Sequence, residues 1–384
     1  MILVLDGVGA GAAHDAEAYG DVGSDTLGNM ARMSGGLSLP NLQALGLGNL
    51  AAVEGVAPTD APEGAWGVME PASAGKDSTT GHWEIAGLHL TSAFPTFPKG
   101  FPPEVIDAFS AATGRGVLGN IPASGTEIIA QFGEEHERTG KWIVYTSADS
   151  VFQVAAHESV VPLAELYAAC ETARMQLVAP NDVSRVIARP FSGHAGAYER
   201  TANRRDYSIA PPGETLIDAL AGAGVHRAGI GKVDDLFAGA LSSHHIADNA
   251  EGIEAILEWL RGAQGGMLFV NLVDFDTLYG HRGDVAGFAR ALRQFDDALP
   301  AIRAALREDD LLFITADHGN DPTTGSSDHA RERVPLLVAG PQVRAVSLGV
   351  RRTFSDLGAT VAEWLNVPFV GQGTSFLPTL ERGV

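Results

Sequence analysis

Acidic and histidine side chains follow three apolar segments that lie far apart in this 384-residue chain. The segments are MILVL, MLFVNLV and LLFITA, and a further histidine lies in the glycine- and serine-rich loop after the last of them. The residues concerned are Asp6, Asp276, His281, Asp317, His318 and His329. Taken one at a time they have ordinary explanations, because a carboxylate often starts a turn or caps a helix and a histidine often lies on a surface loop.

Their shared position after strand-like runs suggests a site, since the crevice of an open α/β sheet lies beyond the carboxyl ends of its strands. Several carboxylates and imidazoles in one small volume would repel each other without a cation, and this ligand set suits zinc, manganese or iron. Two ions about 3.5–4 Å apart form the usual clamp for moving a phosphoryl group. We therefore predict a dimetal site. Its ligand sets are Asp6, Asp317 and His318 for one ion, and Asp276, His281 and His329 for the other.

The stretch SAGKDSTTGHWEIAGL, residues 73 to 88, offers a reacting partner for such a site. Three hydroxyls, on Ser78, Thr79 and Thr80, follow Lys76 and Asp77 at the start of a helix-like run. A serine in this place is most often an N-cap. The same geometry also favours an anion, because free backbone N–H groups and the positive end of the helix dipole would stabilise a phosphate on the serine. Both interpretations stay open from these residues alone.

The composition describes a globular chain of two or three domains, with 45% hydrophobic residues, which is enough for a sizeable core. No run of eighteen apolar residues and no basic leader is visible, so we expect neither a membrane span nor a signal peptide. The single cysteine, Cys170, excludes an internal disulfide and fits a reducing compartment such as the cytoplasm. The formal net charge of −21 argues against a nucleic-acid or membrane partner, because the field of the protein would repel both.

One segment departs from this acidic balance. Residues 185–205 carry five arginines against one acid, Glu199, whereas the whole chain has only four lysines. In a strongly acidic protein such a cluster predicts a pocket for a small anion. A solvated face that balances nearby acids explains the cluster equally well, and the composition does not separate the two interpretations.

Apolar runs and helical patterns alternate along much of the chain, which is typical of a parallel α/β sheet. Several runs are apolar at consecutive positions, as strands covered on both faces are. The runs are 1–5, 142–146, 184–188, 226–230, 267–273, 311–315 and 335–339. Between the later runs, apolar residues recur at spacings of three or four in patterns that begin at Ile253, Val285 and Leu357.

Residues from about 93 to 213 differ from the rest of the chain in their composition and sequence pattern. This segment begins with SAFPTFPKGFPPE, ends with SIAPPGET, and has helical patterns and strands of its own. Both ends look like crossings between domains. We therefore predict an α/β core domain from residues 1–92 and 214–384, with a mostly parallel sheet sandwiched by helices. The prediction adds an inserted, smaller α/β cap domain, residues 93–213, that contributes to the substrate pocket.

Long motifs that span nearly the whole chain resemble the phosphopentomutases of the alkaline phosphatase superfamily. Among them are GKDSTTGHWEIAGL, PASGTEII, RVIARPF, NLVDFDTLYGHRGD and TADHGNDPTTGSSDHARERVPLL. The resemblance implies an alkaline-phosphatase-like core, the two ligand sets given above, typically with manganese, and a phosphorylated nucleophile at Ser78 that touches both ions. It also implies an isomerase that interconverts ribose or deoxyribose 1-phosphate and 5-phosphate through a pentose 1,5-bisphosphate.

The same resemblance extends to the substrate pocket and the activator. Positions that look like the sugar-phosphate pocket are Ser147, Asp149, Arg185, Ile187, Arg189, Arg200 and Lys232. A sugar bisphosphate, either glucose 1,6-bisphosphate or ribose 1,5-bisphosphate, would be the activator. The partners would be small pentose phosphates of nucleoside catabolism. The sequence does not fix the oligomeric state, for which a monomer is favoured.

The chain departs from the family pattern in two places. Threonine is usual where this chain has Ser78, but serine keeps the hydroxyl, and Thr79 is a rival that the GKD spacing disfavours. Ile121 stands before PASGTE, where a lysine can occur, which leaves any cation role there open.

Other functions fit these residues less well. The nearest alternative is a phosphatase or a phosphoglycerate mutase of the same superfamily. A cysteine-type sulfatase is disfavoured because Cys170 lies in a helical stretch. The glycines of GVGAGA, residues 7–12, fit a dinucleotide-binding fingerprint, but the residues after them lack an apolar helical stripe. We therefore expect these glycines to shape the loop around Asp6.

Overall fold

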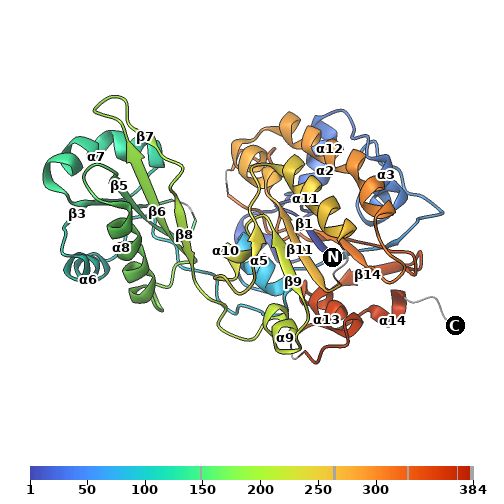
Figure 1. The fold of residues 1–384 in the computed structure, drawn as a ribbon. Helices are drawn as coiled ribbons and strands as arrows, with labels where there is room; N and C mark the ends of the chain where they lie inside the picture. Colours follow the sequence, from blue (N-terminus) through green and yellow to red (C-terminus); the bar gives the residue numbers. More distant parts are fainter. Residues whose placement is uncertain (148, 263–264, 327, 370, 381–384) are drawn as a thin grey trace. The chain divides into compact units, whose positions relative to one another are not determined.

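The computed structural model describes residues 1–147, 149–262, 265–326, 328–369 and 371–380. The chain divides into two compact units (Figure 1). Unit 1 consists of Met1–Ala93 together with Pro211–Val384, and unit 2 is the segment Phe94–Ala210. Unit 2 is therefore formed by one continuous insertion, whereas unit 1 needs both flanking segments.

Unit 1 is built on a sheet in the order β10-β9-β11-β1-β12-β13-β2-β14. β13 is antiparallel to both of its neighbours, and the other pairs are parallel. The strands are β1 (Ile2–Leu5), β2 (Ala65–Met69), β9 (Arg227–Ile230), β10 (Ser243–His244), β11 (Met267–Leu272), β12 (Leu312–Thr315), β13 (Val334–Ala339) and β14 (Ser347–Arg351). The predicted mostly parallel sheet is confirmed.

Helices cover both faces of this sheet: α11 and α12 lie over one face, and α9 and α13 over the other (Figure 1). The three helical patterns expected from Ile253, Val285 and Leu357 belong to α11, α12 and α13. The helices of unit 1 are α1 (Ala16–Tyr19), α2 (Thr26–Met33), α3 (Pro40–Ala44), α4 (Leu47–Leu50), α5 (Ser78–Ile85), α9 (Leu216–Gly222), α10 (Val233–Leu236), α11 (Asn249–Arg261), α12 (Val285–Ala304), α13 (Ser355–Trp364) and α14 (Leu377–Leu380), with a π-helical turn η1 (Phe275–Tyr279) and a 3-10 turn η2 (Gly280–Arg282).

The centre of this sheet is apolar on both faces. Every residue of β1, β11 and β12 is buried, which explains why their sequences are apolar at consecutive positions. β1 lies between the other two, with Ile2 in register with Phe269 on one side and Phe313 on the other. Because the three strands are parallel, their carboxyl ends meet at the same edge of the sheet.

Unit 2 has a mixed sheet in the order β3-β4-β5-β6-β7, with β8 also paired to β6. Side chains alternate along β4, so Trp142 joins one apolar cluster with Phe109 and Phe152, while Tyr145 joins another with Phe191. The elements are β3 (Val117–Pro122), β4 (Trp142–Thr146), β5 (Val151–His157), β6 (Arg185–Ser192), β7 (Glu199–Arg200), β8 (Arg205–Ser208), α6 (Pro103–Thr113), α7 (Gly125–Thr139) and α8 (Leu163–Gln176). Across the described residues of both units, no helix combines the length and apolar character that a membrane crossing needs.

Candidate active site

The predicted ligands lie at the edge of the unit 1 sheet where three neighbouring strands end. Asp6 follows β1 directly, Asp276 lies in the turn η1 after β11, and Asp317 comes two residues after β12. A backbone hydrogen bond joins the ends of β1 and β11, since Asp6 N donates to Leu272 O at 3.2 Å. The sheet order therefore places residues from the beginning and the end of the chain side by side.

Asp6, Asp276 and His318 form one cluster, in which the ligand atoms all lie within 4.8 Å of one another. His318 Nε2 is 3.3 Å from Asp6 Oδ1 and 3.6 Å from Asp317 Oδ2. The other oxygen of Asp317, Oδ1, accepts a hydrogen bond from Gly7 N at 3.1 Å. The structure thus places Asp6, Asp317 and His318 together, and Asp276 adjoins them.

Asp276, His281 and His329 form a second cluster. Asp276 Oδ2 lies 3.1 Å from His281 Nε2, and Asp276 Oδ1 lies 3.3 Å from His329 Nε2. The two histidine nitrogens are 3.2 Å apart. Asp276 therefore belongs to both clusters, whereas the sequence suggested two separate sets.

Two of the ordinary explanations for single residues are wrong. His329 is only 8% exposed, so it is not a histidine on a surface loop. Asp276 does not cap the next long helix, because the N-cap of α12 is Asp284, whose side chain accepts a hydrogen bond from Gly287 N. Neither side chain is accounted for by local structure alone.

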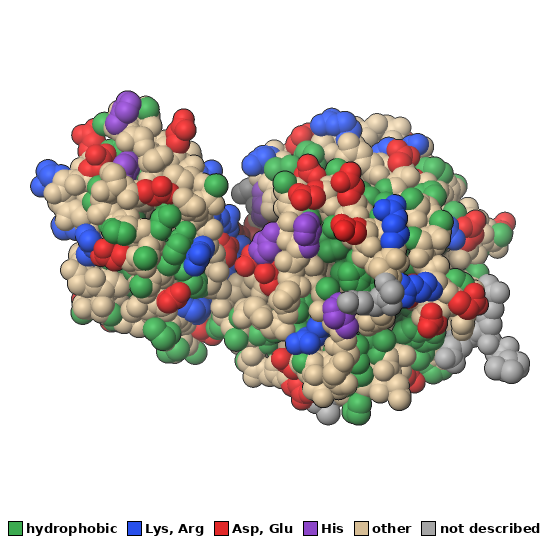
Figure 2. Space-filling view, viewed as in Figure 1, with side chains coloured by type: hydrophobic (Ala, Val, Ile, Leu, Met, Phe, Trp, Pro, Cys, Tyr) green, Lys and Arg blue, Asp and Glu red, His purple; other side chains and the backbone are tan. Residues whose placement is uncertain are grey.

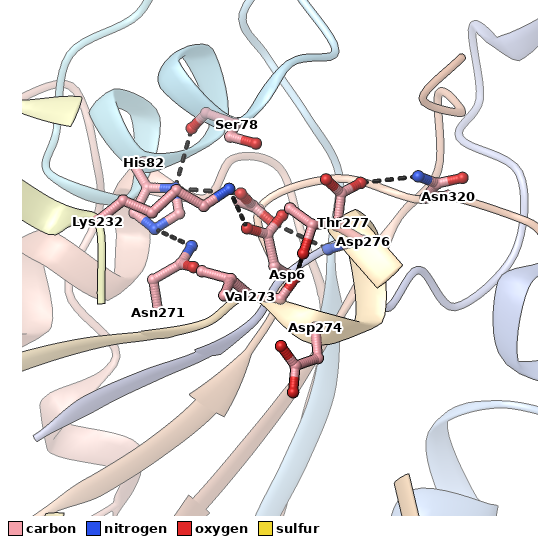
Figure 3. Close-up of polar contacts among 12 residues, drawn as sticks. Asp6, Ser78, His82, Lys232, Asn271, Val273, Asp274, Asp276, Thr277 and Asn320 are labelled. Atoms are coloured by element: carbon pink, nitrogen blue, oxygen red, sulfur yellow. Dashed lines mark hydrogen bonds and ion pairs between the residues drawn. The ribbon is translucent and has the colours of Figure 1, made fainter. Parts of the chain in front are cut away.

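Ser78 is the first residue of α5, and its hydroxyl faces the clusters (Figure 3). Ser78 Oγ lies 3.1 Å from His318 Nε2. The N-cap of α5 is Asp77, whose side chain accepts a hydrogen bond from Thr80 N at 3.1 Å, so Ser78 is not the N-cap. The rival residue Thr79 is buried within the helix.

Helix α5 packs closely against the predicted ligand Asp317. A Cβ atom added to Gly81 would lie 2.1 Å from Asp317 O, so only glycine allows this approach. Farther along the helix, the buried Glu84 accepts hydrogen bonds from Ala72 N and Ser73 N, at 2.9 and 2.7 Å. These contacts fix both the helix and the loop that precedes it.

The charges of the cluster fit a divalent cation. Burial opposes ionisation of Asp6, but Lys232, at 3.1 Å, and His318 hold the pKa of Asp6 below its ordinary value. Burial also opposes the charged form of His318 and by itself would lower its pKa. The negative charges of Asp317, Asp6 and Asp276 outweigh this effect and raise the pKa of His318 to about 10. Within the described residues, both Asp6 oxygens and Asp317 Oδ2 are buried without a hydrogen-bond partner. Buried carboxylate oxygens that no hydrogen bond satisfies are what a divalent metal requires.

Three polar residues around the predicted ligands were missed in the sequence. Asn320 Nδ2 donates to Asp276 Oδ1 at 2.7 Å, and His82 and Asn271 lie on the other side of the site (Figure 3). Asn320 stands two residues after His318, and His82 follows Ser78 at the helical spacing of four, so both could have been found from the motifs. Asn271 gave no such signal, because a single asparagine inside a strand has no pattern.

The predicted sugar-phosphate residues other than Lys232 lie in unit 2. Arg185, Ile187 and Arg189 alternate along β6 and therefore point to one face of that strand. Ser147 Oγ accepts a hydrogen bond from Asp149 N at 3.3 Å, and Arg200 is exposed on β7.

Part of the arginine cluster is neutralised within unit 2. Asp206 lies 2.6 Å from Arg204 and 3.5 Å from Arg185. Arg189 Nε donates to Gln153 Oε1 at 3.1 Å, and burial together with the charge of Arg204 lowers the pKa of Arg189 to about 10. Both interpretations of the cluster therefore keep support, since an acid balances two arginines while Arg189 is half-buried.

Two alternative functions lose their structural basis. Cys170 is buried in α8 of unit 2, and burial raises the pKa of its thiol, so it is no activated nucleophile. After β1, the next helix is α1, which has only four residues and begins at Ala16, not in the glycine stretch. A dinucleotide fingerprint needs a helix that starts there. Instead, Gly7 and Gly11 adopt positive φ angles of 76° and 96° in the loop beside Asp6.

The chain is similar to known proteins over nearly its whole length. The family described as "Metalloenzyme superfamily" matches residues 1–368. A phosphopentomutase of Anaeromyxobacter dehalogenans is 56% identical over 385 residues, covering 100% of this chain and 99% of the relative. One of Desulfitobacterium hafniense is 54% identical over 383 residues, covering 99% of both. A solved phosphoglycerate mutase of Leishmania mexicana aligns with a TM-score of 0.49 at 13% identity, covering 97% of this chain and 96% of that one.

Proposed function

Because the chain belongs to the phosphopentomutase family of the metalloenzyme superfamily, we propose that it interconverts the 1-phosphate and the 5-phosphate of ribose or deoxyribose. The observation that carries this proposal within the molecule is the hydroxyl of Ser78, 3.1 Å from His318 Nε2 at the edge of two candidate metal clusters. The reaction would make the protein an isomerase that works by phosphoryl transfer.

Two divalent ions would be held by the six side chains of the clusters. The sets are Asp6, Asp317 and His318, and Asp276, His281 and His329, with Asp276 between them. When bound, the ions supply positive charge for the phosphoryl oxygens and for the seryl oxygen. Both oxygens of Asp6 and the Oδ2 atom of Asp317 are buried without a hydrogen bond from a described residue, which supports this assignment. Manganese is the metal that we propose.

The chain itself orients the phosphoryl group. A phosphorylated Ser78 would give its phosphoryl group to the free hydroxyl of the bound pentose monophosphate, which forms a pentose 1,5-bisphosphate and leaves the seryl oxygen free. The other phosphoryl group of the bisphosphate, which the substrate carried originally, is then transferred to Ser78, and the isomeric monophosphate leaves. The start of α5 favours the anionic group, since its first backbone N–H groups have no partner within the helix.

The distal phosphate and the sugar would be bound mainly from the insertion. We assign this role to Ser147, Asp149, Arg185, Ile187, Arg189, Arg200 and Lys232. Arginine suits the task because its planar fork of donors matches phosphate oxygens. The position of Lys232 beside Asp6 supports a role close to the transferring group for this residue.

The same proposal covers the activator, the compartment and the partners of the enzyme. A sugar bisphosphate, glucose 1,6-bisphosphate or ribose 1,5-bisphosphate, would activate the enzyme by phosphorylating Ser78. We propose a cytoplasmic monomer of nucleoside catabolism that has no nucleic-acid or membrane partner. The net charge of −21 supports the last point, and the described residues on the face seen in Figure 2 form no large basic patch.

A phosphatase or a phosphoglycerate mutase is the alternative that a shared metal site leaves open. The similarity to phosphopentomutases over the whole chain, at 54% and 56% identity, does not favour this alternative. The test is to incubate the purified protein with Mn²⁺, glucose 1,6-bisphosphate and ribose 5-phosphate and to follow the products by ³¹P NMR. We expect ribose 1-phosphate to accumulate to equilibrium. Release of inorganic phosphate as the main product, or turnover of phosphoglycerate instead, would contradict the proposal.

A further inference from the structure

The imidazole of His82 lies beneath the candidate active site and belongs to neither ligand cluster. It is fully buried and stacks on Phe269, with ring centroids 5.4 Å apart and an angle of 23° between the planes. Its two ring nitrogens face different elements. One faces α5 itself and the end of β12, and the other faces β11 (Figure 3).

The neighbours of the two nitrogens determine where the proton is. Nδ1 lies 2.9 Å from Ser78 O and 3.1 Å from Asp317 Oδ2, and both of these oxygens can only accept a hydrogen bond. Nε2 lies 3.0 Å from Asn271 Nδ2, which can only donate. With the Asn271 amide in this orientation, the proton is on Nδ1 and Nε2 offers its lone pair. The opposite tautomer would place a lone pair against two oxygens.

We infer that His82 and Asn271 are a positioning pair that orients the nucleophile and a metal ligand together. Asn271 holds the ring in the Nδ1–H form, and the Nδ1–H group then binds the carbonyl of Ser78. Asp317 Oδ2 lies 3.1 Å from the same N–H group and has no hydrogen-bond partner among the other described residues. The contact would hold this oxygen in place and leave lone pairs for a cation, as a ligand oxygen requires.

The position of Asn271 makes it a rigid support. It lies in the fully buried strand β11 and is in register with Val4 of β1, two residues before Asp6. The pair thus connects the centre of the sheet to the first turn of α5. A shift of the strand relative to the helix would be transmitted through the ring to Ser78 and Asp317.

The inference rests on the proposed function for the role of Ser78, but its two measurements need no mutase turnover, so the two proposals can fail separately. The first measurement is the tautomer of His82, from ¹⁵N NMR of histidine-labelled protein in the metal-free and the Zn²⁺-loaded states. The His82→Gln variant identifies the signal by its loss.

His136 of unit 2 is an internal reference in the same spectra. Its Nδ1 lies 2.5 Å from Lys141 O, and its Nε2 accepts a hydrogen bond from His157 N at 2.9 Å. We expect the ¹⁵N pattern of His82 to match this neutral Nδ1–H pattern. A ring of His82 that carries its proton on Nε2, or on both nitrogens, would overturn the inference.

The second measurement is the Mn²⁺ affinity of variants at Asn271, by titration calorimetry. Asn271→Leu removes the donor at similar volume, and Asn271→Asp replaces it with an acceptor that draws a proton onto Nε2. We expect both variants to change the tautomer signal and to weaken Mn²⁺ binding by about 10- to 100-fold, the usual effect of losing a partner of a metal ligand.

A matched control is Thr360→Val, which removes a buried hydroxyl from α13 that belongs to neither cluster. It is expected to lower the melting temperature without changing the Mn²⁺ affinity or the His82 signal. If Asn271→Leu leaves the tautomer and the affinity as in the wild type, or changes them no more than Thr360→Val does, Asn271 has no positioning role.

Discussion

Asp77 and Ser78 divide between them two tasks that a single serine could have performed. Asp77 caps α5 by accepting a hydrogen bond from Thr80 N, which leaves the hydroxyl of Ser78 directed at His318. A side-chain oxygen that accepts the capping hydrogen bond is directed at the helix backbone and is not available to a substrate. The separation of the cap from the hydroxyl is therefore what supports Ser78 as a nucleophile.

Replacing Ser78 by alanine tests this role directly. We expect Ser78→Ala to abolish the phosphoenzyme, measured with a ³²P-labelled sugar bisphosphate, and to lower mutase turnover by at least about 10⁴-fold, as the loss of a nucleophile does. The melting temperature should stay near that of the wild type, because Asp77 still caps the helix. Ser78→Thr restores the hydroxyl and is expected to keep turnover. Turnover in Ser78→Ala close to the wild-type value would remove Ser78 as the nucleophile.

Asp317→Asn tests the ligand set at the same scale. The change keeps the shape and the hydrogen bond from Gly7 N but removes the charge and one oxygen. We expect bound Mn²⁺ to fall, with an affinity loss of about tenfold or more, and turnover to fall with it. Metal content is measured by plasma mass spectrometry after gel filtration. A normal metal content together with a normal rate would exclude Asp317 as a ligand.

At the scale of elements, the site depends on how closely helix α5 lies against the turn after β12. A Cβ atom on Gly81 would lie 2.1 Å from Asp317 O and 2.8 Å from Asp317 Cβ, both of which are fixed by the end of the strand. The proposed nucleophile and a candidate ligand are therefore positioned by one backbone contact, with no room for a methyl group. By contrast, a Cβ on Gly222 of α9 would meet nothing within 4 Å.

Gly81→Ala should push α5 away from Asp317. We expect a loss of about 1–3 kcal/mol in the free energy of unfolding, the usual cost of overpacking, and a loss of about 100-fold in turnover, as a displacement near 1 Å causes. The matched control Gly222→Ala is expected to keep turnover and to change stability by less than about 1 kcal/mol. Urea unfolding and the mutase assay measure both quantities. Equal effects of the two variants would show that the close approach is not needed.

At the scale of the whole molecule, the two flanking segments of unit 1 are joined by a buried carboxyl group. Glu332 Oε2 accepts hydrogen bonds from Gly11 N and Thr26 N, at 3.3 and 2.9 Å, and Oε1 accepts one from the Thr26 hydroxyl at 2.8 Å. Burial raises the pKa of Glu332 to about 8, and the charges of Asp321 and Asp25 act in the same direction. The folded protein therefore holds a proton there that the unfolded chain releases at its ordinary pKa of 4.5.

This proton makes part of the stability dependent on pH. Between pH 4.5 and 8 the unfolded state binds fewer protons at Glu332 than the folded state. The contribution of this proton to the free energy of unfolding is therefore fully present below pH 4.5 and is lost as the pH rises toward 8. Glu332→Gln resembles the neutral form, and we expect its unfolding free energy to fall less from pH 5 to pH 8 than that of the wild type. The exposed Glu54→Gln is the control. Parallel pH curves for Glu332→Gln and the wild type would contradict the assignment.

The sequence by itself determined the candidate metal ligands and the class of fold. Carboxylates and histidines after apolar runs predicted a dimetal site, and runs 1–5, 267–273 and 311–315 correspond to β1, β11 and β12. These features are local, because strand character and the residue that follows a strand can be read from neighbouring positions. The edge strand β14, SLGVR, and the glycine-containing β2, AWGVM, were not recognised, since neither has a clear apolar pattern.

Only the tertiary structure decided how these residues meet. The sheet order β11-β1-β12 brings Asp276 between two clusters, and the packing of α5 places Ser78, but not Thr79, beside His318. The same packing creates the His82–Asn271 pair, whose members are far apart in the chain. The physical reason is that the order of strands and the seating of a helix depend on the burial of apolar faces across the whole unit, which no local spacing of residues records.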